Sequence, residues 1–315
     1  QVWIPRFSFA HPGVKDIFML MLPVIGGQAA GEVNKLVDTL FAYSLEDGIV
    51  TALFYANRLI QLPLSMFGFA TAAAILPIIS TAWAKDDEQA IRRTLVQGFR
   101  QTFFLVCPAA LGLIVLGKPI IWLLFERGNF QPSDTFRTAT AMAYYAAGLL
   151  FFALVKVAVT GFYGAKDTRT PVIVSTLSML LNILLNCLLV RPLGYRGLAL
   201  ATTLSFGVNF SALYVLLWDK YGRLWDKGLL STVIRITAAA VVALAVAYAV
   251  YVRLFNVYTE DALQRFLVRL IVVGGAIGSS MLCYFFSCWV LRVQETAVVF
   301  RFFSSGKRKA NQRGR

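Results

Sequence analysis

The chain has 315 residues, of which 58 % are hydrophobic and only 15 % charged, and its mean hydropathy is +0.68. This composition is too apolar for a soluble domain and predicts a polytopic membrane protein. The formal net charge of +14 would suit a nucleic-acid-binding protein, but the basic residues stand at the ends of apolar runs and in the C-terminal tail. We therefore expect no nucleic-acid partner.

Apolar runs of helical length recur along the sequence, and a membrane-spanning helix needs roughly 20 such residues. We predict eight spans, with limits 14–44, 48–84, 90–116, 134–163, 171–192, 195–219, 229–252 and 266–291. The first span contains Pro23 and three charged residues, so hydropathy alone scores it poorly. An even number of spans and the distribution of charge favour it. The predicted fold class is an all-α polytopic membrane protein.

Lys and Arg residues divide unevenly between the two sides of these spans, with 17 on the side of both termini and 8 on the other. By the positive-inside rule both termini are cytoplasmic. Residues 1–13 then form a cytoplasmic lead, and 294–315 form a basic cytoplasmic tail that suits anionic lipid. The segment 118–130 is too short to span, so we expect it along the outer interface. Arg100 lies near the predicted membrane boundary of the third span, where snorkelling of its long side chain to the interface explains a charge without a function.

The second span contains a single arginine, Arg58, in an otherwise apolar helix. Exposing a guanidinium to lipid at mid-bilayer costs on the order of 3 kcal/mol, so such a residue usually faces a watery cavity or a partner. Its fork of donors suits an acid on another helix or a phosphate ligand. Pro63 and Pro77 permit bends in the same helix. Lys156, inside the fourth span, either snorkels or faces a cavity.

Glu32, Lys35 and Asp38 follow one another at intervals of three in the first span, so neighbours can pair along one stripe. If Glu32 and Lys35 neutralise each other, Asp38 is left as a candidate cation ligand or proton carrier. Asn182 and Asn186 share one face of the fifth span. Their amides either bond a neighbouring helix or offer carbonyl oxygens to a cation.

No catalytic constellation is visible. The cysteines lie in apolar segments without a nearby histidine and are interpreted as small core residues; they are Cys107, Cys187, Cys283 and Cys288. The single histidine, His11, belongs to the predicted lead. With no nucleophile beside a base, we expect the protein not to be an enzyme.

Four segments carry a resemblance to a known family: Tyr55–Ala70 (YANRLIQLPLSMFGFA), Leu124–Phe130 (LFERGNF), Val155–Val157 (VKV) and Gly161–Pro171 (GFYGAKDTRTP). In this order they closely resemble the MviN/MurJ family of lipid II flippases, within the wider group of multidrug and lipid-linked oligosaccharide exporters. The resemblance implies a V-shaped transporter of two lobes. Residues 14–221 would form its second six-helix lobe and 222–293 two accessory transmembrane helices, with the first lobe missing from this chain.

The resemblance also implies functional residues. Cavity arginines of the family bind the lipid pyrophosphate, and the one in the Tyr-Ala-x-Arg-Leu motif corresponds to Arg58. The predicted substrate-binding residues are Arg58, Lys156, Glu32 and Lys35. Some members hold sodium, and the matching positions here are Asp38, Asn182, Asn186 and Thr202. Asn186 stands where a sodium-binding relative has an acid, which removes one charge from the ligand set.

The predicted function is movement of lipid II from the inner to the outer leaflet of a bacterial inner membrane by alternating access. Expected partners are lipid II or a similar polyprenyl-pyrophosphate lipid, and the missing lobe or another subunit; sodium is the one ion suggested, and no other cofactor is expected. Two alternatives remain open. One is a cation-coupled exporter of drugs or oligosaccharides from the same superfamily. The other is a non-transporting scaffold for cell-wall synthesis, which predicts that loss of Arg58 is harmless.

Overall fold

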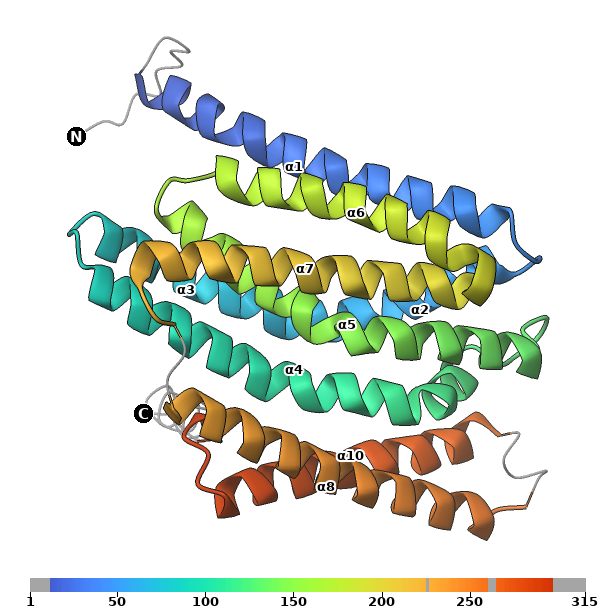
Figure 1. Ribbon diagram of the computed structural model, residues 1–315. Helices are drawn as coiled ribbons and strands as arrows, with labels where there is room; N and C mark the ends of the chain where they lie inside the picture. The colour runs from blue at the N-terminus through green and yellow to red at the C-terminus, as the bar shows by residue number, and fades with distance from the viewer. Residues whose placement is uncertain (1–11, 225–226, 260–264, 297–315) are drawn as a thin grey trace, which may run out of the picture.

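The computed structural model describes residues 12–224, 227–259 and 265–296, and within them all regular structure is helical. The elements are α1 (Pro12–Tyr43), α2 (Ile49–Pro63), the π-helical η1 (Leu64–Phe69), α3 (Ala70–Trp83), α4 (Glu88–Leu124), α5 (Pro132–Gly164), α6 (Arg169–Leu193), α7 (Tyr195–Tyr221), α8 (Lys227–Val257) and α10 (Phe266–Val290) (Figure 1). Because α2, η1 and α3 follow without a break, they occupy one predicted span. The all-α prediction is confirmed; most of the predicted lead, most of the tail and the loop at 260–264 lie outside the described residues.

Seven helical rods are long and apolar enough to cross a membrane, within the part of the chain that the structure describes. The first rod, α1, has 32 residues but is not one of the seven. This agrees with the expectation that the charged residues of this span lower its mean hydropathy. The limits of the other helices agree with the sequence prediction within a few residues, except for α4 and α8 at their C-terminal ends.

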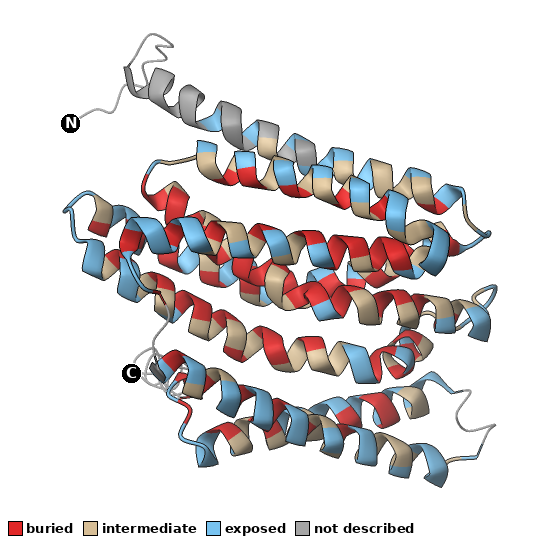
Figure 2. Cartoon of the chain, viewed as in Figure 1, coloured by how far each residue is buried: buried red, intermediate tan, exposed pale blue. Residues whose placement is uncertain are grey.

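Helix α5 is the centre of the bundle. It packs against α2, η1, α3, α4 and α7, and buried residues gather along it in Figure 2. In its most apolar stretch 61 % of the residues are buried, against 17 % for α10, most of whose surface is exposed. Gly148 permits the close approach of α7, since a Cβ there would lie 2.6 Å from Thr203 Oγ1.

The prediction of an interfacial segment at 118–130 is wrong. Helix α4 continues through Lys118 and Pro119 to Leu124. Leu116, Pro119 and Ile121 are buried, so packing against the bundle stabilises the last turns despite the missing proline N–H. Only the residues after Leu124 form a loop.

The loops group as the alternating topology requires. At one end, Arg137 Nη2 of α5 lies 2.8 Å from Glu46 Oε2 in the turn between α1 and α2. At the other end, Arg92 Nε donates to the Arg223 carbonyl at 2.7 Å. Turns predicted to share a side of the membrane therefore lie together in the structure.

Helices α8 and α10 pack on each other and on α4, away from α1 (Figure 1). Arg100 of α4 pairs with Glu295, which follows α10, at 2.7 Å, and donates to Thr232 of α8 at 3.1 Å. The snorkelling prediction for Arg100 is therefore wrong, because its partner lies 195 residues further along the chain. The accessory pair is tied to the bundle by this partly buried ion pair.

Two more polar contacts join α10 to α4. Pro108 cannot donate to the Phe104 carbonyl, and the Tyr284 hydroxyl donates to that oxygen instead, at 2.6 Å. At the far end of α4, Arg269 donates to the carbonyls of Trp122 and Glu126 at 3.1 and 3.0 Å. A cation at a helix C-terminus is electrostatically favourable.

The cysteine prediction holds in part. Cys107 and Cys288 are buried between α4 and the accessory pair, and Cys283 is half-buried. Cys187 is exposed, because it follows the buried Asn186 on α6 and so points about 100° away from it around the helix.

Candidate functional site

Arg58 lies on the exposed face of α2. The opposite face packs into the core through Ala56, Leu59 and Ile60, so the helix directs Arg58 and Phe54 outward. The guanidinium carbon of Arg58 lies 5.8 Å from the centre of the Phe54 ring. Among the described residues the ion pairs involve Lys35, Arg100 and Arg137, so Arg58 has no acidic partner there.

The helix changes geometry directly after Pro63, where the π-helical η1 begins. Gly68 of η1 lies against Ala153 of α5; an added Cβ would be 3.2 Å from the Ala153 Cβ. This close approach places Phe69 beside Lys156, whose Nζ is 4.8 Å from the ring centre. π-helical turns often occur at functional sites. Pro63 predicted a possible bend, but no sequence signal predicted this contact.

Lys156 is half-buried and has no ion-pair partner in the described part of the chain. Lys35 of α1 lies within electrostatic range of it. Lys35 also forms the predicted pair with Glu32, at 2.7 Å, but the two side chains are 65 % and 72 % exposed. No hydrogen bond or ion pair in the described residues connects Arg58 with the other three.

The four residues of the predicted cation site do come together. Asn186 Nδ2 of α6 donates to Asp38 Oδ1 of α1 at 2.6 Å and to Asn182 Oδ1 at 3.0 Å. Asn182 Nδ2 lies 3.4 Å from Thr202 Oγ1 of α7. Asn182, Asn186 and Thr202 are buried, so the network sits inside the junction of α1, α6 and α7.

Two members of this network were not predicted. In one orientation Asn182 Nδ2 lies 3.3 Å from Ser205 Oγ. With its amide turned by half a rotation, Asn182 Nδ2 lies 2.9 Å from Asn34 Oδ1 and its Oδ1 accepts from the Thr202 N–H at 3.1 Å. Asn34 stands one turn before Asp38, and that spacing is the signal that identifies it.

An aromatic cluster joins the loop after α4 to the helix of Arg58. The ring of Tyr55 lies 4.4 Å from that of Phe125 and 5.9 Å from that of Phe130. Phe125 and Phe130 are the two phenylalanines of the LFERGNF segment. The cluster anchors this loop one helical turn from Arg58.

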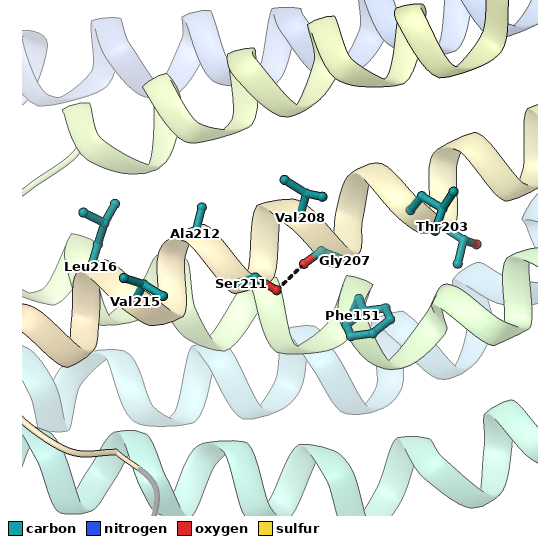
Figure 3. Close-up of a pocket in the computed structure, with 9 residues that line it drawn as sticks. Phe151, Thr203, Gly207, Val208, Ser211, Ala212, Val215 and Leu216 are labelled. Atoms are coloured by element: carbon teal, nitrogen blue, oxygen red, sulfur yellow. Dashed lines mark hydrogen bonds between the residues drawn. The ribbon is translucent and has the colours of Figure 1, made fainter. Parts of the chain in front are cut away.

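A separate pocket of about 750 Å³ lies along α7 beside Phe151 of α5 (Figure 3). Its two hydroxyl groups already have acceptors, since Thr203 donates to the Tyr144 carbonyl and Ser211 to the Gly207 carbonyl, each at 2.8 Å. The remaining lining residues are apolar or glycine. The pocket therefore has no charged side chain, and both of its hydroxyl protons are already donated within the protein.

Comparison with known proteins identifies relatives over much of the chain. The family profile described as lipid II flippase MurJ matches residues 2–274. A probable lipid II flippase MurJ of Vibrio cholerae serotype O1 is 39 % identical over 210 residues, which are 67 % of this chain and 40 % of that protein. Its counterpart in Rhizobium meliloti is 34 % identical over 284 residues, 89 % of this chain and 51 % of that protein. The chain thus spans about half the length of these relatives.

Solved structures agree in fold. The lipid II flippase MurJ in an inward closed conformation matches with a TM-score of 0.70 and 23 % identity, covering 90 % of this chain and 56 % of that one. A MOP superfamily transporter from Pyrococcus furiosus matches with a TM-score of 0.57 and 17 % identity, covering 90 % and 66 %. At such identities the likeness concerns the fold alone. Because the family profile extends over most of its residues, the chain belongs to the lipid II flippase MurJ family, a family of membrane transporters rather than of catalytic enzymes.

Proposed function

We propose that this chain forms one lobe of a lipid II flippase and binds the pyrophosphate of its lipid through Arg58. The observation that carries the proposal is the position of Arg58 on an exposed face in an apolar span, without an acidic partner among the described residues. A guanidinium presents a planar fork that matches two phosphate oxygens. Family membership supports a pyrophosphate lipid as the ligand.

Lys156 and Lys35 extend the cationic surface toward the centre of the bundle. Lys156 is held against Phe69 and Lys35 is partly neutralised by Glu32. A pyrophosphate carries more than one negative charge, so Arg58 alone would leave it undercompensated. We therefore assign these three residues to successive positions of the headgroup, with Lys156 acting deeper than Arg58.

A monovalent cation is the ion that we propose for the Asp38 network. Asp38, Asn182, Asn186 and Thr202 all carry side-chain oxygens, and hard cations prefer such ligands. The observation that fits a cation is Asn186 Oδ1, which is buried without a hydrogen-bond partner in the described structure. A bound cation would neutralise Asp38 and join α1 to α6 and α7.

The protein would work in the bacterial inner membrane with both termini cytoplasmic. The exposed polar face of α1 and α2 would pair with a first lobe or with another subunit, since an exposed charged surface in lipid is costly. The basic tail would contact anionic lipid. Alternating access would then come from rocking of two lobes around a central site.

Binding of lipid II to the purified chain, measured by native mass spectrometry, tests the proposed ligand. We expect Arg58→Ala to weaken binding by about tenfold or more, because hydrogen bonds to a charged group contribute roughly 1.5–3 kcal/mol. Arg58→Lys should recover part of the loss, since lysine keeps the charge but not the fork. Arg137→Ala is the matched control, as Arg137 already pairs with Glu46.

Equal lipid II binding by Arg58→Ala and by the parent chain would contradict the proposal. The same experiment separates the alternatives. An exporter of cationic drugs would bind a lipophilic cation in place of lipid II. A scaffold would bind neither ligand in an Arg58-dependent way.

A further inference from the structure

Helix α10 contacts the end of α4 where the chain enters the loop 125–131, and this loop packs on the helix of Arg58. We propose that Arg269 of α10 is a positioning residue for Arg58: it fixes the course of the loop, and the loop holds the part of α2 that carries Arg58. The inference rests on the role of Arg58 proposed above, and its test separates the two. Figure 1 shows the C-terminal end of α4 and the N-terminal ends of α2 and α10 at the same end of the bundle.

Arg269 binds the point at which the hydrogen bonding of α4 stops. In a longer helix the Trp122 carbonyl would accept from the N–H of Glu126, four residues further on. The helix instead ends at Leu124, and Phe125 has φ −122°. Arg269 Nη1 donates to the carbonyls of Trp122 and Glu126, at 3.1 and 3.0 Å. One nitrogen thus joins the last turn of α4 to the loop and fixes the direction in which the chain leaves the helix.

The accessory pair also holds the guanidinium itself in place. The guanidinium carbon of Arg269 lies 4.4 Å from the centre of the Trp122 ring. That ring lies 6.1 Å from the ring of Phe255 on α8. Because a cation is attracted to the face of an aromatic ring, the guanidinium has a defined position from which it binds the two carbonyls.

The loop 125–131 carries this restraint to α2 and α5. The rings of Phe125 and Phe130 lie 4.4 and 5.9 Å from the ring of Tyr55 on α2. The Glu126 carboxylate accepts from the Thr135 hydroxyl of α5 at 2.5 Å. The backbone of Glu126 is therefore held by α10 and its side chain by α5. These two contacts fix the residues from which the phenylalanine rings reach α2.

The position of Arg58 follows that of α2, since no acid among the described residues pairs with it. The core face of α2 is held by the packing of Ala56 and Ile60. Tyr55 is half-buried and stands one turn before Arg58, so the loop supports the side of the helix next to the arginine. A binding group that must be ordered when its ligand arrives lowers the affinity. Loss of the support should therefore weaken binding through Arg58.

Lipid II binding by four proteins, measured by native mass spectrometry, tests whether Arg269 acts through Arg58. The four are the parent chain, Arg58→Ala, Arg269→Met and the combination of the two. We expect Arg269→Met to weaken binding about threefold or more, as changes along such chains of contacts do. In the Arg58→Ala background the same change should have no further effect. Arg269→Lys should recover most of the binding, because an ammonium can also donate to two carbonyls.

Arg235→Met is the matched control. Arg235 of α8 donates to the Leu291 carbonyl at 3.2 Å, so it is another arginine of the accessory pair that binds a backbone carbonyl. Neither residue belongs to the loop 125–131, and we expect this variant to bind lipid II like the parent. Binding that is unchanged in Arg269→Met, or weakened equally with Arg58 and without it, would overturn the proposal.

Hydrogen exchange of the same variants in nanodiscs without lipid II gives a second readout. Peptides covering 125–131 and 53–60 should exchange faster in Arg269→Met than in the parent chain or in Arg235→Met. Peptides from the middle of α5 should not change. Phe125→Leu keeps both carbonyls that Arg269 binds and removes only a ring, so it should weaken lipid II binding and accelerate exchange of 53–60 in the same way.

Unchanged exchange of 53–60 in both Arg269→Met and Phe125→Leu would also overturn the proposal. If Arg58→Ala binds lipid II as well as the parent chain does, the proposed role of Arg58 fails. The exchange of 53–60 then decides by itself whether Arg269 positions this part of α2.

Discussion

At the scale of single residues, the charged side chains inside the spans differ in the groups that hydrogen-bond to them or compensate their charge. Arg100 has Glu295 and Thr232, and Asp38 has Asn186. Arg58 and Lys156 have only aromatic rings in the described structure, at 5.8 and 4.8 Å. A cation over a ring gains about 0.5–2 kcal/mol, less than an ion pair with full hydrogen bonding would return inside a membrane. This is why we propose these two residues as contacts for an anionic ligand.

Lys156 provides a test at this scale. Replacing it with methionine removes a half-buried charge that no acid compensates in the described residues, while keeping the volume and the contact with Phe69. We expect the thermal midpoint of Lys156→Met to be unchanged or higher and its lipid II binding to be weaker than that of the parent. Phe69→Leu, which removes only the ring, is the control. A clear loss of thermal stability in Lys156→Met would show that the lysine is structural.

Sequence reasoning reached some of these sites and not others, for a physical reason. Helical spacing placed Asn182 with Asn186 and Glu32 with Lys35, because these pairs are local. The charge left over in the same helical series identified Asp38, and the resemblance to a family brought in Thr202. The partner of Arg100 and the ring beside Lys156 depend on contacts between distant segments. No local pattern encodes those contacts.

At the scale of helices, the accessory pair is held to α4 at both of its ends. Arg100 and Tyr284 act near one end and Arg269 near the other. Figure 2 shows many exposed residues on α8 and α10, and a buried apolar cluster that includes Phe104, Ile236 and Tyr284 also joins the pair to α4. We infer that the pair moves with α4 as one body.

A double-mutant cycle tests this attachment. Arg100 and Glu295 are only 19 % and 8 % exposed, so removing one partner leaves an uncompensated charge. We expect Arg100→Ala to destabilise the chain by about 3 kcal/mol or more. The combined variant Arg100→Met with Glu295→Leu should cost much less, because both charges are gone. Additive losses in thermal unfolding would mean that the pair is not coupled.

Span limits were predictable because apolar runs of about 20 residues are written directly in the sequence. Two local features were not predicted from the sequence. The segment 118–130 was predicted to lie along the interface, but burial of Leu116 and Ile121 carries α4 onward to Leu124. Pro63 suggested a bend, whereas the structure forms a π-helical turn fitted against Ala153. Such outcomes depend on packing against residues that are distant in the sequence, and local sequence patterns do not specify that packing.

At the scale of the whole molecule, the grouping of loops agrees with an alternating path through the membrane, and the charge bias assigns the two sides. Single cysteines at Glu46 and Gln131 should react with an impermeant thiol reagent added outside cells. A cysteine at Gln89 should react only after the cells are opened. The opposite pattern would reverse the assignment of inside and outside while leaving the helix packing intact.

Arg58 and Lys35 lie on exposed faces of α2 and α1, and the proposed alternating access requires a second lobe facing them. We therefore expect these 315 residues by themselves to insert into a bilayer without moving lipid. A first lobe supplied separately should restore transport. The proposed role of Arg58 is therefore best tested with both lobes present.

The most direct measurement is leaflet exchange of a labelled lipid II analogue in liposomes that contain this chain reconstituted with a first lobe. The account predicts rapid exchange by the two lobes together, little by the chain alone, and loss of exchange in Arg58→Ala at an equal amount of inserted protein. Exchange that is as fast in Arg58→Ala as in the parent, or full exchange by the monomeric chain alone, would contradict it.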